Sequence, residues 1–264
     1  MNYFELTQKF IENSKKASDL KELALLFNGL IKKMGCTHFV CLSHVDPLNP
    51  PDDAVVLTNY PLEWGIHHSK QQYHRFDPIM HTCKNRLTPF TWSSETWRYL
   101  LNLQQSHMLN EAGEFGLGEG HTIPIHPPSG YSASLSVVFE PGEVDPEALN
   151  ALHLIAFFLY EAALHMKTKM IYLYNPRKQL TPRQREILEL IAQGKSNWDI
   201  GAVLAISEST VKDHVTSIFK ALNVSSRQQA IVKALFHGEI RYGDIDVSPP
   251  TKSNDNSGFI HLRS

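Results

Sequence analysis

Several features that would mark other protein classes are scarce or missing in this sequence. Its 264 residues contain three cysteines, Cys36, Cys41 and Cys83, an odd number with no Cys-x-x-Cys pair. This usage argues against a disulfide framework and favours free thiols, packed as small apolar side chains in a reducing cytoplasm. No apolar run approaches membrane-spanning length, and the N-terminus lacks the basic and apolar regions of a secretory signal. We therefore expect a soluble, cytoplasmic protein with no membrane partner.

Metal-binding and catalytic patterns are missing as well. The chain contains 14 histidines, but none has a ligand spacing supported by neighbouring carboxylates or thiolates, so we predict no metal site. Ser, His and Asp are all present, yet no Gly-x-Ser-x-Gly nucleophile elbow occurs. We predict no catalytic residues and no cofactor, and an enzyme is the weakest function class that the sequence leaves open.

Three short helices with clear start and stop signals follow one another in residues 180–222. Thr181, Ser196 and Ser207 each stand where an N-cap is needed, and Gly194 suits the left-handed end of the first helix. The third helix carries an apolar stripe at helical spacing, formed by Val211, Val215, Ile218 and Leu222. Two short helices, a tight turn and a third helix with a polar face are typical of a helix-turn-helix.

The polar face of the third helix indicates what this unit contacts. Hydroxyls, lysines and one carboxylate lie off the apolar stripe, and such side chains suit phosphates and base edges in a major groove. Composition alone does not separate this interpretation from an ordinary solvated helix face. We predict DNA contacts from Arg183, Ser209, Thr210, Lys212, Asp213, Thr216, Lys220 and Arg227.

The charge distribution supports a DNA-binding unit by a small margin. Residues 177–241 hold ten Lys and Arg against six Asp and Glu, a net charge of +4. Residues 1–176 hold 13 against 18, and the whole chain has a net charge of −2. A locally basic unit inside a slightly acidic protein is typical of a module that binds nucleic acid.

Four stretches of this C-terminal region closely resemble the DNA-binding domain of LuxR-type transcription regulators. The resemblance covers about sixty residues without a gap and is far more specific than a bare helix-turn-helix pattern. The stretches are Leu180-Thr-Pro-Arg-Gln-Arg-Glu186, Gln193-Gly-Lys-Ser-Asn-Trp-Asp-Ile200, Ser207-Glu-Ser-Thr-Val-Lys-Asp-His214 and Leu222-Asn-Val-Ser-Ser-Arg-Gln-Gln-Ala230.

The N-terminal region alternates between helical and strand patterns. Amphipathic helices are predicted at 3–13 and 18–34, and an apolar helix at 145–172. Strand composition appears at 37–42, 54–57, 121–126 and 131–139. We expect an α+β protein, with an N-terminal α-β-α sandwich around a mostly antiparallel sheet and a small all-α, four-helix C-terminal domain.

An aromatic cluster with one carboxylate stands out between residues 60 and 92. Tyr60 and Trp64 are four residues apart and could share one face of a helix after Pro61. Asp77 precedes a proline, which is typical of a helix N-cap. By themselves, these residues fit an ordinary aromatic core and a capped helix.

The pattern also resembles, more loosely and over residues 10–170, the autoinducer-binding domain of the LuxR-type family, whose members sense N-acyl homoserine lactones. The resemblance implies that Tyr60 donates its hydroxyl to the ligand's amide carbonyl and that Trp64 donates its indole N–H to the lactone carbonyl. It also implies that Asp77 accepts the ligand's amide N–H, that Trp92 stacks over the lactone, and that Ser136 adds a hydroxyl near the amide. A neutral amide in an apolar pocket needs such donors and such an acceptor.

His68 departs from the family pattern, which usually has tyrosine beside the acyl chain at this position. Histidine is smaller, more polar and titratable near neutral pH. Two alternatives stay open: His68 belongs to a pocket for an unusual ligand, or it turns to solvent together with His67. Gly116, Gly118 and Gly120 do not form a dinucleotide fingerprint, and the resemblance assigns them to turns.

These patterns predict an autoinducer-binding sensor domain at 1–172, a linker at 173–179, a LuxR-type DNA-binding domain at 180–241 with the helix-turn-helix at 196–220, and a disordered tail at 242–264. The predicted function is a dimeric transcription regulator that binds an N-acyl homoserine lactone or similar amphiphile and a two-fold-symmetric site on double-stranded DNA. RNA polymerase is a further candidate partner. The alternatives are a regulator that is ligand-independent or senses another metabolite and, more weakly, a lactone hydrolase fused to a DNA-binding domain.

Overall fold

The computed structural model describes residues 2–127, 130–140, 144–174 and 179–245, with side chains described up to Lys169 in the third range. The chain divides into two compact units, Met1–Pro176 and Arg177–Ser264. The predicted linker at 173–179 begins inside a helix that runs to Tyr174, and its residues 175–178 lie outside the described part of the chain, as do residues 246–264 of the predicted tail.

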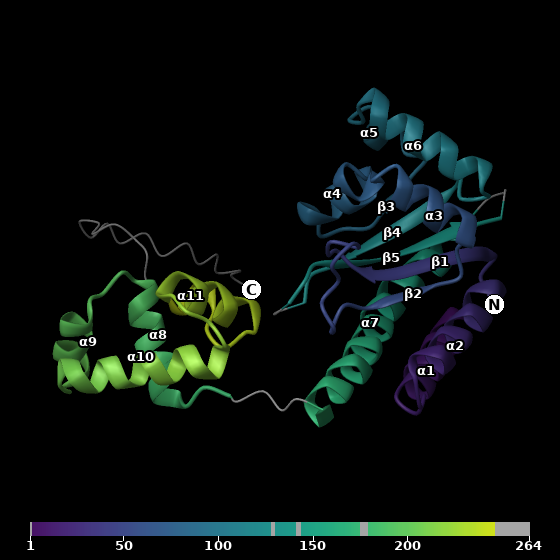
Figure 1. The fold of residues 1–264 in the computed structure, drawn as a ribbon. Helices are drawn as coiled ribbons and strands as arrows, with labels where there is room; N and C mark the ends of the chain where they lie inside the picture. The colour runs from purple at the N-terminus through teal and green to yellow at the C-terminus, as the bar shows by residue number, and fades with distance from the viewer. Residues whose placement is uncertain (1, 128–129, 141–143, 175–178, 246–264) are drawn as a thin grey trace, which may run out of the picture. The chain divides into compact units, whose positions relative to one another are not determined.

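A five-stranded sheet forms the centre of the N-terminal unit (Figure 1), with strand order β2-β1-β5-β4-β3 and antiparallel pairing between all neighbours. The strands are β1 Cys36–Ser43, β2 Val56–Thr58, β3 Phe90–Thr91, β4 Gly120–Ile125 and β5 Ala133–Phe139. The two-residue strand β3 was not predicted, because two residues carry no alternation pattern.

Three helices cover one face of the sheet: α1 Tyr3–Ser14, α2 Leu20–Lys33 and α7 Pro146–Tyr174. Side chains from these helices and from alternate strand positions form the larger apolar core. By length and composition alone, Pro146–Lys169 is apolar enough to cross a membrane, contrary to the expectation that no segment would be. Much of that apolarity serves the core, since Leu152, Ile155 and Leu159 of α7 are fully buried.

Shorter helices cover the opposite face: α3 Leu62–Lys70, the 3-10 helix η1 Tyr73–Arg75, α4 Pro78–Lys84, α5 Glu95–Arg98 and α6 Leu103–Glu114. An aromatic-rich second core lies between them and the sheet. The two covered faces confirm the predicted α-β-α sandwich and its antiparallel sheet.

The described residues of the C-terminal unit, 179–245, form four α-helices around one apolar core: α8 Pro182–Ala192, α9 Asn197–Leu204, α10 Glu208–Leu222 and α11 Arg227–Phe236. Three predicted N-caps are confirmed, because Thr181, Ser196 and Ser207 each accept a hydrogen bond from a backbone N–H of the first turn. Tyr242–Asp244 forms a 3-10 turn, η2, and Ile245 is buried in the same core. The expectation that 242–264 is tail throughout was therefore wrong for its first four residues, whose contacts a periodicity pattern does not reveal.

The turn between α9 and α10 depends on close backbone packing. Ala205 ends α9 in the left-handed conformation, with φ of 53°. A Cβ atom added to Gly201 would lie 2.8 Å from the backbone oxygen of Ile206. Glycine at this position therefore lets the turn fold back against its own helix.

Candidate ligand pocket and nucleic-acid interface

The two faces of the central sheet differ in polarity. Leu135 and Val137 of β5 belong to the core under α1, α2 and α7, whereas Val138 belongs to the core under α3–α6. Because side chains alternate along a strand, Ser134 and Ser136 face the same side as Val138. Both serines are almost fully buried. Hydroxyl groups in the middle of a covered sheet face are typical of a surface that binds a polar group.

Trp92 is fixed against this polar face. Its indole Nε1 donates to Thr122 Oγ1 at 2.9 Å, and Thr122 Oγ1 lies 2.8 Å from Ser136 Oγ. The Trp92 ring packs so closely on β4 that a Cβ added to Gly120 would lie 2.6 Å from it. Gly120 thus allows a close approach of the indole and is not a turn glycine, which corrects one of the three turn assignments. Gly116 does have the positive φ of a turn residue, 80°.

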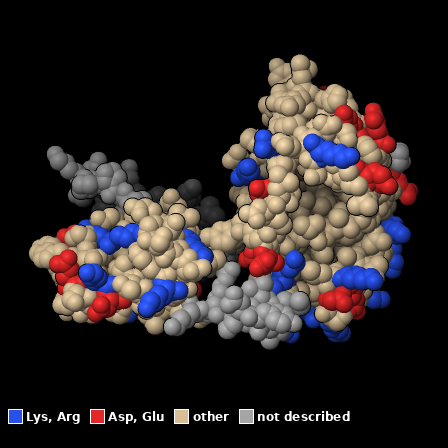
Figure 2. Space-filling view, viewed as in Figure 1, with Lys and Arg blue, Asp and Glu red and all other residues tan. Residues whose placement is uncertain are grey.

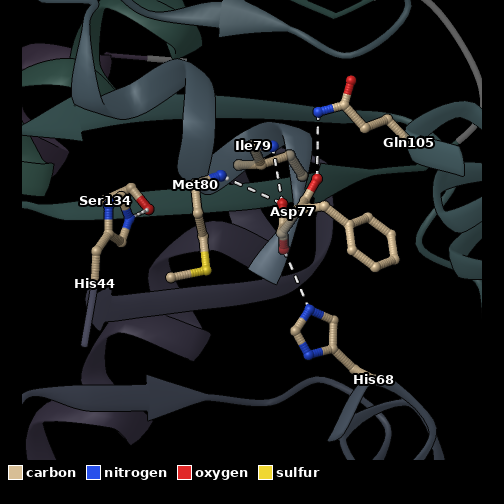
Figure 3. Close-up of polar contacts among 8 residues, drawn as sticks. His44, His68, Asp77, Ile79, Met80, Gln105 and Ser134 are labelled. Carbon is tan, nitrogen blue, oxygen red and sulfur yellow. Dashed lines mark hydrogen bonds and ion pairs between the residues drawn. The ribbon is translucent and has the colours of Figure 1, made fainter. Parts of the chain in front are cut away.

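Asp77 has the N-cap role that its position before proline predicts. Its Oδ1 accepts from the backbone N–H of Ile79 at 2.8 Å and of Met80 at 3.3 Å, at the start of α4. The second carboxylate oxygen, Oδ2, lies 3.2 Å from His68 Nε2 (Figure 3). The Asp77 side chain is only 11% exposed. Oδ1 therefore caps α4, while Oδ2 points toward His68 and the aromatic cluster.

His68 turns toward Asp77 and Trp64 rather than to solvent, since its side chain is 22% exposed. Besides its contact with Asp77, its ring centroid is 5.7 Å from the ring of Trp64. His67 takes a different course: its Nε2 lies 2.7 Å from Glu111 Oε2 of α6. Tyr73 also donates a hydrogen bond from its hydroxyl to that carboxylate. The hydrogen bond from Tyr73 lowers the pKa of Glu111 most, and the one from His67 lowers it further.

Tyr60 and Trp64 belong to the same aromatic cluster, but not through helical spacing. Tyr60 precedes Pro61, the N-cap of α3, so it lies outside the helix that carries Trp64. The Tyr60 hydroxyl is buried and has no hydrogen-bond partner among the described residues. Burial, and then the charge of Asp77, raise the pKa of Tyr60 well above its usual range. A buried unpaired hydroxyl is unfavourable by about 1–3 kcal/mol, so this group favours a ligand with an atom that accepts a hydrogen bond from it.

A cavity of about 230 Å³ opens beside Asp77. Of the six residues predicted to bind ligand, only Asp77 lines it. The half-buried lining residues are His44, Val45, His74, Asp77 and Met80. Sequence reasoning missed His44 and His74, because no local pattern indicates that the end of β1 and the 3-10 helix η1 meet across a cavity.

Two hydrogen bonds that the sequence did not predict connect the helices around the site to neighbouring segments. Arg98 Nε of α5 donates to the carbonyl of Trp92 at 2.8 Å. Gln105 Nε2 of α6 donates to the carbonyl of Phe76 at 3.3 Å (Figure 3). These contacts link α5 and α6 to the residues that precede α4 and follow β3.

In the C-terminal unit, α10 has the two faces that the sequence predicts. Its apolar stripe, Val211 to Leu222, is buried, while Lys212, Asp213, Thr216 and Lys220 are exposed. Ser209 is also exposed, and Thr210 is half-buried with its Oγ1 2.8 Å from Ser207 Oγ. Figure 2 shows Lys and Arg spread over the visible face of this unit, with Asp and Glu gathered toward the α9 end.

Two arginines predicted to contact DNA also make contacts inside the unit. Arg183 donates to the carbonyl of Leu204 at 2.9 Å and to Glu186 at 2.7 Å. Arg227 donates to Asn197 Oδ1 at 2.7 Å and to the carbonyl of Lys195 at 2.8 Å. Burial lowers the pKa of Arg227. Both arginines position α9 relative to its neighbours, a role that the sequence did not reveal.

Comparison with protein families matches both units. Residues 19–163 match the autoinducer binding domain, and residues 178–234 match the bacterial regulatory proteins of the luxR family. The first match lies inside the predicted sensor region 1–172, and the second begins two residues before the predicted DNA-binding region 180–241 and otherwise lies within it.

Similar proteins are regulators of transcription. The chain is 31% identical, over 69% of its length and 74% of the relative's, to the transcriptional activator protein BjaR1 of Bradyrhizobium diazoefficiens. It is 30% identical, over 81% of its length and 87% of the relative's, to the quorum sensing-dependent transcriptional regulator RpaR of Rhodopseudomonas palustris. The crystal structure of Escherichia coli SdiA shares the fold, with a TM-score of 0.72 at 19% identity over 90% of this chain and 99% of SdiA.

Proposed function

Because this chain belongs to the LuxR family of autoinducer-binding transcription regulators, and is not an enzyme, we propose that its sensor unit binds an N-acyl homoserine lactone. In this proposal the ligand controls DNA binding by a cytoplasmic homodimer. The single observation that carries the ligand proposal is the Tyr60 hydroxyl, which is buried, has no hydrogen-bond partner among the described residues, and is acted on by the charge of Asp77. A donor beside an acceptor inside an aromatic cluster is complementary to a secondary amide.

The remaining contacts of the proposed ligand follow from the same chemistry. Tyr60 donates to the amide carbonyl, Asp77 Oδ2 accepts the amide N–H, and the Trp64 indole N–H donates to the lactone carbonyl. Trp92 lies over the lactone ring, held there by its hydrogen bond to Thr122. Ser136, already bonded to Thr122, adds a hydroxyl near the amide.

Organic extraction of the purified full-length protein, followed by mass spectrometry, tests this proposal. The protein should be produced in a host without a lactone synthase, with and without added acyl homoserine lactones. We expect a lactone to be retained in stoichiometric amount after gel filtration when it is supplied. Retention of a different amphiphile, or of nothing, would remove the lactone from the proposal and leave the DNA-binding role standing.

One observation favours a second candidate, a regulator that is ligand-independent or senses another metabolite. His68 Nε2 already lies 3.2 Å from the Asp77 oxygen that the lactone amide would need. When His68 donates to Asp77 Oδ2, the carboxylate has a hydrogen-bond partner without any ligand, and the site needs no lactone to satisfy it. The extraction experiment separates the two candidates, since only the lactone sensor retains its signal.

Replacing His68 by tyrosine tests how this residue sets ligand choice. We expect His68→Tyr to shift preference toward ordinary acyl homoserine lactones, because it frees Asp77 Oδ2 and restores the family's aromatic ring beside the acyl chain. The measurement is a reporter titration with a panel of acyl lengths. The matched control is His107→Tyr, since His107 is an exposed histidine on α6. An unchanged ranking in the His68 variant would mean that this residue does not touch the ligand.

We propose that α10 enters the major groove and that Lys212 and Lys220 have different tasks there. If Lys220 touches phosphate alone, Lys220→Ala weakens binding equally on all sequences and lowers the salt slope by about one. If Lys212 reads a base, Lys212→Ala relaxes specificity at one position per half-site, by about 1–3 kcal/mol. Binding titrations on single-base variants of the site, at several salt concentrations, measure both effects. Equal losses on every variant with Lys212→Ala would assign Lys212 to phosphate instead.

The proposed DNA-bound form is a homodimer on a two-fold-symmetric site, because one such module reads few base pairs. On α7 the apolar side chains of Leu154 and Phe157 are 48% and 44% exposed, which suits a contact between the sensor units of two protomers. On α11 Val232 has an exposed apolar side chain, whereas Ala234 is fully buried in the core of its own unit. We expect footprints of two half-sites separated by whole helical turns. A single asymmetric footprint by a monomer would overturn the dimer. RNA polymerase is a candidate partner of the DNA-bound dimer.

A further inference from the structure

The first turn of α8 holds a buried amide against helix α10. Gln184 is the one buried polar residue in the described part of the C-terminal unit, residues 179–245. Its Nε2 donates a hydrogen bond to Ser217 Oγ of α10 at 3.0 Å. The two helices pack against each other over a shared apolar core (Figure 1). The polar group in this small core is therefore tied to a residue of α10.

The orientation of this amide follows from its second partner. Gln184 Oε1 accepts a hydrogen bond from the backbone N–H of Thr181 at 2.9 Å, as one half of the capping box of α8. A backbone N–H only donates, so the amide oxygen faces Thr181 and the amide nitrogen faces Ser217. Turning the amide over would break both hydrogen bonds, which is unfavourable for a buried group. The amide therefore has one arrangement.

The neighbouring residue ties the other helix of the helix-turn-helix to the same turn. Arg183 Nη2 donates to the carbonyl oxygen of Leu204, the last residue of α9. The carbonyl groups at the end of an α-helix have no partner within the helix, so this hydrogen bond satisfies one of them. Two consecutive side chains of α8 therefore hold α9 and α10.

Apolar packing does not by itself fix the rotation of α10. The stripe from Val211 to Leu222 is buried in the core, but contacts between apolar side chains have no preferred direction. A hydrogen bond is directional and weakens steeply away from its best geometry. Ser217 lies in the sequence between Thr216 and Lys220, which are exposed and predicted to contact DNA. A rotation of α10 at Ser217 would move both of these side chains relative to a base edge or a phosphate.

We propose that Gln184 is a positioning residue for DNA recognition, because its hydrogen bond to Ser217 holds α10 at the rotation in which the exposed face meets the major groove. Gln184 acts through Ser217 and not on a nucleotide, since its side chain is buried in its own unit. The inference rests on the proposed entry of α10 into the groove. Loss of the bond should weaken binding to a specific site more than binding to DNA in general. Non-specific binding depends on phosphate charge and carries no information from base edges.

Binding titrations of the full-length protein on two DNA samples of equal length test this inference. The first is a duplex that the wild-type protein selects from a random pool in the presence of acyl homoserine lactones, and the second is the unselected pool. The measured quantity is the ratio of the two affinities, the specificity ratio. We expect Ser217→Ala and Gln184→Met each to lower this ratio by about 2- to 10-fold, the usual range for one hydrogen bond. The double variant should lower it no further than the larger single effect, because both substitutions remove the same bond.

Two control variants separate the position of α10 from general damage. Ser217→Thr keeps the hydroxyl group and should keep the specificity ratio. Thr181→Ala removes the hydroxyl that accepts from the backbone N–H of Gln184, and so weakens the cap of α8 while the amide of Gln184 remains. Thr181→Ala should lower the unfolding temperature and leave the ratio unchanged, since a loss of folded protein reduces both affinities by the same factor.

The outcomes separate this inference from the function on which it rests. An unchanged ratio in Ser217→Ala and Gln184→Met would show that α10 keeps its position without the bond, and the inference would be wrong. Additive losses in the double variant would mean that Ser217 touches DNA by itself, which also overturns it. So would an equal fall of the ratio in Thr181→Ala, which would assign the effect to the stability of α8. If the wild-type protein enriches no duplex from the pool, recognition of a specific site by α10 fails and the inference falls with it.

Discussion

Asp77→Asn should raise the half-maximal signal concentration of a reporter by about 10- to 100-fold. The substitution replaces Oδ2 by an amide N–H₂, which cannot accept the ligand's amide N–H. The lost interaction is a charge-assisted hydrogen bond, worth about 1.5–3 kcal/mol. Asparagine is as good an N-cap as aspartate, so the remaining Oδ1 still accepts from Ile79 and Met80 at the start of α4.

The control for Asp77→Asn is Asp19→Asn. Asp19 caps α2 and accepts from the backbone N–H of Glu22 at 2.8 Å, outside the proposed ligand site. The Asp19→Asn substitution should leave the half-maximal signal concentration unchanged. Trp64→Phe keeps an aromatic ring but removes the indole N–H, and should also weaken the response. If Asp77→Asn and Trp64→Phe both respond like wild type, the assignment of the amide and lactone contacts is wrong.

Gly201→Ala should destabilise the helix-turn-helix by about 1–3 kcal/mol, the usual range for overpacking a tight site. The new Cβ would lie 2.8 Å from the carbonyl oxygen of Ile206, which is backbone and does not swing away as a side chain does. The turn must move, and α10 moves with it. We therefore expect a loss of DNA affinity beyond the loss of stability.

Hydrogen exchange of peptides from α9 and α10 measures this local effect, and titration with a DNA site measures the functional one. Gly29→Ala is the matched control, since Gly29 lies inside α2 with no atom within 4 Å of an added Cβ. It should gain about 0.5–1 kcal/mol from helix propensity. Ala205→Gly should also stabilise the turn, by about 1–2 kcal/mol. Ala205 has the left-handed backbone conformation, which is strained for alanine and not for glycine. Unchanged exchange and affinity in Gly201→Ala would show that the turn adapts without loss.

Local chemistry in the sequence was sufficient for most of the architecture. Thr181, Ser196 and Ser207 act as caps as predicted, and the stripe from Val211 to Leu222 is buried as its spacing requires. These features depend on a few neighbouring residues, whose periodicity and capping chemistry are visible in one dimension. The same holds for Asp77, which caps α4 because proline follows it.

The sequence by itself determined the two-unit organisation, the fold class, the helix-turn-helix and which aromatic residues between 60 and 92 cluster together. Tertiary structure alone decided that His68 turns to Asp77, that Gly120 lies under the Trp92 ring, and that His44 lines a cavity beside Asp77. Each of these contacts joins residues whose positions are set by the order of strands and the packing of helices. Helix periodicity and capping act within a few residues along the chain, whereas contacts across a sheet or a cavity depend on the whole fold.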